Sequence, residues 1–123
     1  MQLNYSTVGS NDLEKAKAFY DSLFGAIGVG KVFDHPSGGR IYGQHGGAMF
    51  AVLGPYNGKP ATYGNGAMCG FGLDSREQVD AFYAKALALG GTDEGAPGER
   101  GPGFYFAYFR DLDGNKLCAY KFG

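Results

Sequence analysis

The chain has 123 residues, with 11 basic and 12 acidic side chains and a formal net charge of −1. This length suits one domain with a single core, and the balanced charge disfavours nucleic acid and anionic membrane surfaces as partners. No segment approaches the roughly 20 apolar residues of a membrane span, and the N-terminus lacks a basic flank. We therefore expect a soluble cytoplasmic protein whose two cysteines, Cys69 and Cys118, are free thiols.

The first half of the chain predicts a strand, a helix and three further strands. Approximate alternation indicates a strand at residues 3–8, and an apolar stripe with helical spacing predicts a helix from Asp12 to about Phe24. Glycine pairs then separate three short strand candidates, at residues 29–34, 40–44 and 48–53. Two prolines and four glycines in residues 54–66 indicate a linker, so the first module spans about 1–53.

The second half repeats this order. A strand is predicted at residues 68–73, a helix from Ser75 to about Leu89, and a weak strand near residues 92–96. Two longer strands follow at residues 104–110 and 116–122, joined by a turn at Asp113 and Gly114. The second module therefore spans about 67–123, within one domain of residues 1–123.

A constant offset of 63 residues relates the two modules. The tripeptide Ala-Phe-Tyr occurs at residues 18–20 and again at residues 81–83. The same offset places Asn11 on Asp74, each followed three residues later by a glutamate, which is the pattern of a capped helix N-terminus. A shared cap, apolar stripe and register favour an internal duplication over chance.

These modules predict an α+β fold made of two tandem βαβββ units. One helix covers one face of each small sheet, so the bare faces of the two sheets can curve into a shared cup. The strand at residues 104–110 carries five aromatic side chains; most are expected in the core, and the remainder would face the cup. The glycine- and proline-rich linker permits the modules to pair within one chain or to be exchanged between two chains.

Two segments resemble the vicinal oxygen chelate superfamily, which includes glyoxalase I, bleomycin resistance proteins and extradiol dioxygenases. Residues 8–20 are similar to its first strand-to-helix junction, and residues 110–115, Arg-Asp-Leu-Asp-Gly-Asn, are similar to the turn before its last strand. Leu112 stands where that turn usually has proline. The resemblance covers nearly the whole chain and implies paired βαβββ modules with a small molecule or a metal in the cup, commonly in a homodimer.

The resemblance also indicates where a metal would be held, on the first and last strands of each module. The corresponding positions are Tyr5 and Met68 on the first strands, Cys118 on the final strand, and Phe50, or else Val52, on the matching strand of module one. Family enzymes have histidine or glutamate there. Tyr, Phe, Met and Cys suit a hard divalent ion poorly, although Met68 and Cys118 could hold a soft one. We therefore expect no metal, and interpret Tyr5, Phe50, Met68 and Cys118 as ligand-binding residues.

The sequence leaves several functions open. The leading hypothesis is a metal-free protein that binds a small, largely apolar or aromatic molecule in the cup. The alternative is an enzyme, a lyase or isomerase of the glyoxalase type or a dioxygenase-like protein, using a metal displaced to His35 and His45 or metal-free acid–base chemistry by Tyr5 and Cys118. A third possibility is a partner-binding domain whose cup is packed shut.

Overall fold

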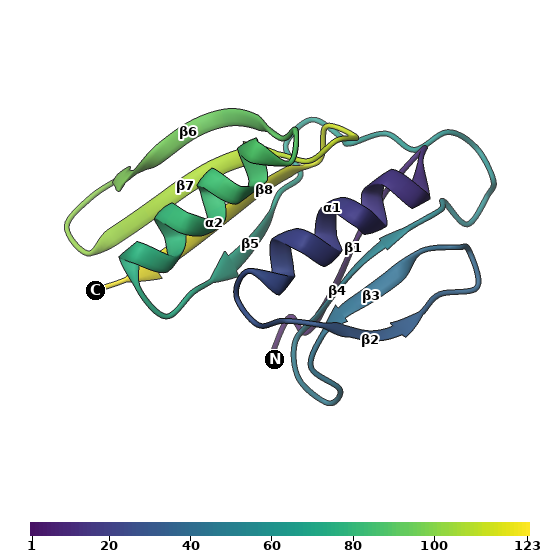
Figure 1. Cartoon of the computed structure of the whole chain (residues 1–123), viewed down its shortest axis with the longest axis horizontal. Helices are drawn as coiled ribbons and strands as arrows, with labels where there is room; N and C mark the ends of the chain where they lie inside the picture. Colours follow the sequence, from purple (N-terminus) through teal and green to yellow (C-terminus); the bar gives the residue numbers. More distant parts are fainter.

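The computed structural model describes residues 1–123 and contains two βαβββ modules (Figure 1). The first module consists of β1 (Tyr5–Gly9), α1 (Leu13–Gly25), β2 (Lys31–Asp34), β3 (Arg40–Gly43) and β4 (Met49–Leu53). The second consists of β5 (Cys69–Gly72), α2 (Arg76–Ala88), β6 (Thr92–Glu99), β7 (Phe104–Arg110) and β8 (Lys116–Phe122). The predicted α+β class and the order of elements are confirmed. Each helix has 13 residues, and neither is long and apolar enough to cross a bilayer.

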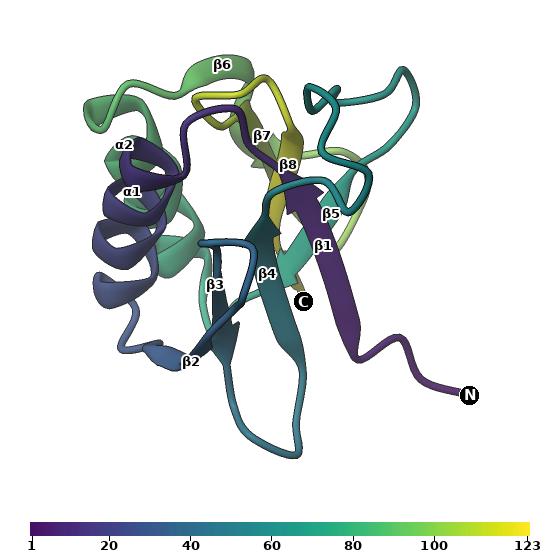
Figure 2. The ribbon, with the colours of Figure 1, turned by 90° about the vertical axis from the view of Figure 1, so that its right-hand side faces the viewer.

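The two four-stranded sheets have the same topology, with strand orders β1-β4-β3-β2 and β5-β8-β7-β6. In each sheet the first strand pairs in parallel with the last strand of its module, and the other pairs are antiparallel. Both helices lie on one side of the sheets, so the helix-free faces lie together on the other side (Figure 2). β1 and β5 are the edge strands that lie next to each other between the modules.

The helix caps follow the 63-residue offset but lie one residue later than predicted. Asp12 caps α1, because its carboxylate accepts a hydrogen bond at 3.2 Å from the backbone amide three residues later. Ser75 caps α2 in the same way at 3.0 Å. The prediction that Asn11 and Asp74 are the caps was therefore wrong, although the duplicated capping pattern itself is present.

Asn11 instead holds the linker in place. Its side-chain oxygen accepts a hydrogen bond at 2.7 Å from the backbone amide of Ala61, and its side-chain nitrogen donates to the carbonyl of the same residue at 3.1 Å. Its own backbone amide donates to a carboxylate oxygen of Asp113, 102 residues further along the chain. One asparagine thus connects the first module, the linker and the turn of the second module.

A single aromatic core extends across both modules. Phe24 of α1 contacts Phe50 of its own module, at a centroid distance of 5.7 Å, and Phe71 and Phe82 of the other module, at 5.4 and 6.1 Å. Phe50 also packs edge-on against Phe71 at 5.2 Å. Because aromatic rings bury large apolar areas, these contacts hold the two modules together as one folding unit.

The turn between β7 and β8 joins the modules through a buried carboxylate, that of Asp111, which is 4% exposed. It accepts hydrogen bonds from the hydroxyl of Tyr20 on α1 at 2.5 Å, from the backbone amides of Asp113 and Asn115, and from the side chain of Asn115. The Asn115 side chain also donates to the carbonyl of Gly9 at the end of β1. Burial and the neighbouring carboxylate raise the pKa of Tyr20 well above its usual value. The predicted turn is therefore a polar joint between the two halves.

Candidate functional site

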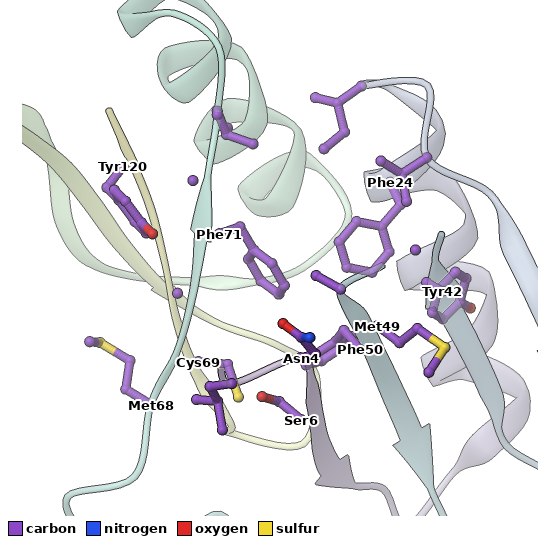
Figure 3. Close-up of a pocket in the computed structure, with 18 residues that line it drawn as sticks. Asn4, Ser6, Phe24, Tyr42, Met49, Phe50, Met68, Cys69, Phe71 and Tyr120 are labelled. Carbon is purple, nitrogen blue, oxygen red and sulfur yellow. The ribbon is translucent and has the colours of Figure 1, made fainter. Parts of the chain in front are cut away.

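A largely apolar cavity of about 560 Å³ lies between the modules (Figure 3). Phe24 and Phe50 line it from the first module, and Phe71 and Leu73 line it from the second. Thirteen of its 18 lining residues are hydrophobic, so its walls favour apolar surface over charge. The cavity has the size of a small-molecule site rather than of a packing defect.

The cavity exists because two sheet edges face each other without pairing. β1 and β5 are each hydrogen-bonded on one side only, to β4 and to β8. Asn4, Ser6 and Cys69 contribute polar or polarizable groups near these edges, and the Tyr120 ring lines the cavity from β8. Burial raises the pKa of the Cys69 thiol, so this group is neutral at physiological pH. The site therefore offers a few uncharged polar groups within apolar walls.

The structure places the four predicted site residues in different surroundings. Phe50 and Met68 line the cavity, whereas Tyr5 and Cys118 do not. Tyr5 is 47% exposed on β1. Cys118 is buried and faces away from α2, because its neighbours Leu117 and Ala119 on β8 belong to the core beneath that helix. Burial raises the pKa of Cys118 to about 11.

Strand pairing identifies Ala51 as the counterpart of Cys118. In the first sheet Thr7 pairs with Ala51, and in the second Gly70, which is 63 residues after Thr7, pairs with Cys118. Phe50 pairs with Ser6 and lies on the opposite face of β4, toward α1. The predicted equivalence of Phe50 and Cys118 was thus wrong by one residue in register. A shift of one residue along a strand places the side chain on the opposite face of the sheet.

Sequence reasoning missed Tyr120 and the glycines that accommodate it. A Cβ atom at Gly72 would lie 3.1 Å from the Tyr120 hydroxyl oxygen, and one at Gly70 would lie 3.4 Å from the ring and 2.9 Å from the Cys118 sulfur. Side chains on β5 would therefore displace the ring from the cavity wall. The spacing Gly70-Phe71-Gly72 is a signal that could have indicated such an approach, because glycine within a strand often marks close contact from a neighbour.

Comparison with known proteins decides the family. The model of the glyoxalase/bleomycin resistance protein/dioxygenase superfamily matches residues 2–119. The chain belongs to this superfamily. A crystal structure of a superfamily member from Albidiferax ferrireducens T118 is 44% identical, with a TM-score of 0.90 over 98% of both chains. This superfamily is the one predicted as vicinal oxygen chelate, and that prediction is confirmed.

More distant solved structures share the fold. A lactoylglutathione lyase from Agrobacterium tumefaciens is 24% identical, with a TM-score of 0.72 over 98% of this chain and 92% of that one. The fosfomycin resistance protein FosX from Listeria monocytogenes is 19% identical, with a TM-score of 0.71 over 100% of this chain and 94% of that one. No protein of curated function matches the sequence closely enough to extend this comparison.

The residues at the superfamily's metal positions do not fit a hard divalent ion. Tyr5, Met68, Cys118 and Ala51, the counterpart of Cys118, include no imidazole and no carboxylate, which are the groups such ions prefer. No three His, Cys, Asp or Glu side chains of the chain come together in one place. Chemistry that depends on a hard divalent ion therefore lacks suitable ligands at these positions.

The two histidines do not form a displaced site. His35 lies in the turn between β2 and β3, and His45 lies in the turn between β3 and β4, so they are at opposite ends of β3. The His35 ring is hydrogen-bonded within its own turn, to the hydroxyl and the backbone amide of Ser37. The hypothesis of a two-imidazole metal site is therefore not supported by the arrangement of these residues.

Proposed function

We propose that this chain is a binding member of the superfamily, which holds a small, largely apolar or aromatic molecule between its modules without the usual metal. The observation that carries the proposal is the cavity of about 560 Å³ with 13 hydrophobic residues among 18 in its lining. Small-molecule sites have this size and composition, and a few polar groups in them fix the orientation of the ligand. Asn4, Ser6 and Tyr120 are the groups available for that role.

The lining side chains suit a ring better than a flexible polar molecule. Phe24, Phe50 and Phe71 offer aromatic faces and edges from both modules, and such contacts favour a second aromatic ring. Met49 and Met68 add unbranched, polarizable side chains that adapt to ligands of different outline. No Lys, Arg, Asp or Glu lines the cavity, so a charged ligand would lose its hydration without gaining an ion pair.

Ligand binding can be tested with indole, a small neutral aromatic probe with one N–H donor. We expect saturable shifts in the methyl NMR signals of Met49, Met68 and Leu73, which line the cavity. Val29→Trp narrows the cavity and should abolish the shifts. Phe33→Trp is the control, because it places the same indole ring at an exposed position of β2 outside the cavity. This variant should leave the shifts unchanged. Two results would contradict the proposal. One is that indole still shifts the methyl signals of the Val29→Trp variant, and the other is that the shifts of the unmodified chain do not saturate.

The metal-free part of the proposal has a separate test. Protein purified without added metal should contain far less than one equivalent of transition metal by inductively coupled plasma mass spectrometry. The reason is the donor set, since Tyr5, Ala51, Met68 and Cys118 supply no imidazole and no carboxylate. One tightly held ion per chain, retained through dialysis against a chelator, would overturn this part while leaving the binding test intact.

The enzymatic alternative has no observation in its favour beyond the superfamily resemblance. Its metal-free version needs Cys118 as a base or nucleophile, which requires the thiolate. Burial raises the pKa of Cys118 to about 11, so the thiol is protonated at neutral pH. Cys118→Ala should therefore leave ligand binding unchanged. If the unmodified chain shows a catalytic turnover that Cys118→Ala abolishes, the enzymatic alternative would be supported instead.

We also propose that the chain is a cytoplasmic homodimer. The dimer is what the superfamily resemblance implies, and exposed apolar side chains such as Tyr5 and Met68, 47% and 48% exposed, accord with it. A reducing compartment accords with two free cysteines. Light scattering during size-exclusion chromatography should give twice the mass of one chain, and a monomer at micromolar concentration would exclude the dimer.

A further inference from the structure

Three sites in the chain place glycine directly after an asparagine or aspartate: Asn57-Gly58, Asn65-Gly66 and Asp113-Gly114. At such a pair the backbone nitrogen of the glycine can attack the side-chain carbonyl carbon of the residue before it. Glycine favours this attack because it has no Cβ atom to obstruct the close approach. All three pairs can therefore cyclise, and the fold decides which of them is free to do so.

Hydrogen bonds hold the reacting groups of Asn57 and Gly58. The amide nitrogen of Gly58 donates to the carbonyl of Pro55 at 3.0 Å, which closes a turn. The side-chain oxygen of Asn57 accepts a hydrogen bond from the backbone amide of Lys59, also at 3.0 Å. The turn must open before the nitrogen can attack the side chain, so the fold protects this pair.

The pair Asp113-Gly114 is held in a similar way. The Asp113 carboxylate accepts a hydrogen bond at 2.9 Å from the backbone amide of Asn11, and the amide of Gly114 donates to the carbonyl of Asp111 at 3.2 Å. The Tyr63 ring packs on the same turn, since a Cβ atom at Gly114 would lie 2.8 Å from it. Cyclisation here would break contacts of the polar joint.

No such restraint acts on Asn65 and Gly66. Both residues are exposed. Neither the side chain of Asn65 nor the backbone amide of Gly66 has a hydrogen-bond partner in the chain. Nothing lies within 4 Å of the position that a Cβ atom at Gly66 would occupy, so no neighbouring atom crowds the glycine. Attacking nitrogen and target carbon are both free to move.

We propose that Asn65 is a site of spontaneous covalent modification, at which cyclisation with Gly66 and hydrolysis give aspartate and isoaspartate. The Gly66 nitrogen gives its proton to solvent and forms a bond to the Asn65 side-chain carbonyl carbon. The bond from that carbon to the amide nitrogen breaks, and the nitrogen takes up a proton and leaves as ammonia. Water then opens the cyclic imide at either of its carbonyl carbons. One water is consumed and one ammonia released, with no oxidant or reductant.

The isoaspartate product lengthens the chain beside the inter-module cavity. Its backbone runs through the former side chain, which adds one carbon atom between two anchored points. One is Tyr63, whose ring centroid lies 5.3 Å from the guanidinium carbon of Arg110, and the other is Cys69, where β5 begins. Met68 lies in this interval and lines the cavity. The inference does not depend on the function proposed for the cavity, because the modification needs no ligand.

Mass spectrometry of the full chain tests the inference. Native and guanidinium-denatured protein would be incubated at mildly alkaline pH in water enriched in heavy oxygen, which enters the new carboxylate. Chymotrypsin can cleave after Tyr63 and so places Asn57 and Asn65 in separate peptides. In the native chain Asn65 should react at least about fivefold faster than Asn57, the ratio that corresponds to one net hydrogen bond. In denaturant the two rates should be nearly equal, because the turn at Gly58 is lost.

Matched variants separate the site from its surroundings. Asn65→Gln lengthens the side chain by one carbon, which disfavours ring closure, and should abolish the modification at residue 65. Asn57→Gln is the control and should leave that modification unchanged. Asn65→Asp supplies the carboxylate without the extra backbone atom. It should therefore move the methyl NMR signal of Met68 less than isoaspartate at the same position does.

Four results would overturn the inference or its parts. Equal rates at Asn57 and Asn65 in the native chain would refute protection by the turn. The same excess of Asn65 over Asn57 in denaturant would show that the neighbouring sequence, and not the fold, sets the rates. Reaction at residue 65 in the denatured chain alone would show that the fold protects this site too. Equal displacement of the Met68 signal by aspartate and isoaspartate would refute the effect of the longer backbone.

Discussion

Removing the Tyr20 hydroxyl tests the polar joint between the modules. In Tyr20→Phe the aromatic ring remains in the core, while the buried Asp111 carboxylate loses its 2.5 Å hydrogen bond from the hydroxyl. A hydrogen bond to a charged group contributes about 1.5–3 kcal/mol to stability. Asp111 keeps its three donors from Asp113 and Asn115, so the loss should stay in that range rather than approach the cost of an unpaired buried charge.

The chain offers a matched control in Tyr105→Phe. The Tyr105 hydroxyl donates to the Asp80 carboxylate at 2.6 Å, so the chemistry and the distance nearly equal those of the Tyr20 pair, but this pair is exposed to water. Urea unfolding followed by circular dichroism should give a free energy of unfolding about 2 kcal/mol lower for Tyr20→Phe. Tyr105→Phe should lose clearly less. Equal losses in the two variants would refute the argument that burial gives the joint its strength.

Three further predictions follow from burial, charge and close approach. Burial raises the pKa of both Tyr20 and Tyr42, whereas in the unfolded chain both phenols ionise near pH 10. The free energy of unfolding should therefore fall as the pH rises above about 10. Absorbance at 295 nm should show that these two phenols ionise only when the chain unfolds. Phenolate signals for all tyrosines in the folded chain would contradict this. Burial raises the pKa of the Cys118 thiol to about 11, so this thiol should resist iodoacetamide at pH 8 in the folded chain and react in denaturant. Complete alkylation of Cys118 within minutes in the folded chain would show that the thiol is accessible. A Cβ atom at Gly39 would lie 2.1 Å from a backbone carbonyl oxygen of β4, so Gly39→Ala should cost about 3 kcal/mol or more in urea unfolding. Gly25→Ala, where nothing lies within 4 Å, should be neutral or stabilise by up to about 1 kcal/mol; similar losses at both sites would argue against the close approach.

Local patterns were sufficient to predict the elements. Strands 104–110 and 116–122 were predicted with the bounds that the structure has, because segments rich in aromatic and other apolar residues lie there next to glycine-containing turns. The helix caps were predicted one residue early, since Asn11 and Asp12 are both good capping residues. What distinguishes them is distant in sequence: Asn11 is occupied by Ala61 and Asp113. A pattern within one segment contains no information about such contacts.

The candidate site was harder to predict for the same reason. The offset of 63 residues correctly relates Thr7 to Gly70, but β6 and β7 have 8 and 7 residues where β2 and β3 have 4 each, so the offset does not hold at β4 and β8. Phe50 was therefore assigned to the position that Ala51 occupies. The cavity itself depends on how the edges of β1 and β5 approach each other, which no pattern within either strand specifies.

The joint at Asp111 has a consequence for the order of events during synthesis. The carbonyl of Gly9 and the amide of Asn11 receive their partners from Asn115 and Asp113, which lie 106 and 102 residues further along the chain. At a translation rate of about 5–20 residues per second, roughly 100 residues take about 5–20 s to appear. During this interval the nascent first module presents its unfilled polar groups and the exposed side of its aromatic core. The final twenty residues of the chain thus supply the hydrogen-bond partners of groups in its first twenty. A ribosome that stalled before the final twenty residues would leave the first module incomplete and accessible to chaperones and proteases.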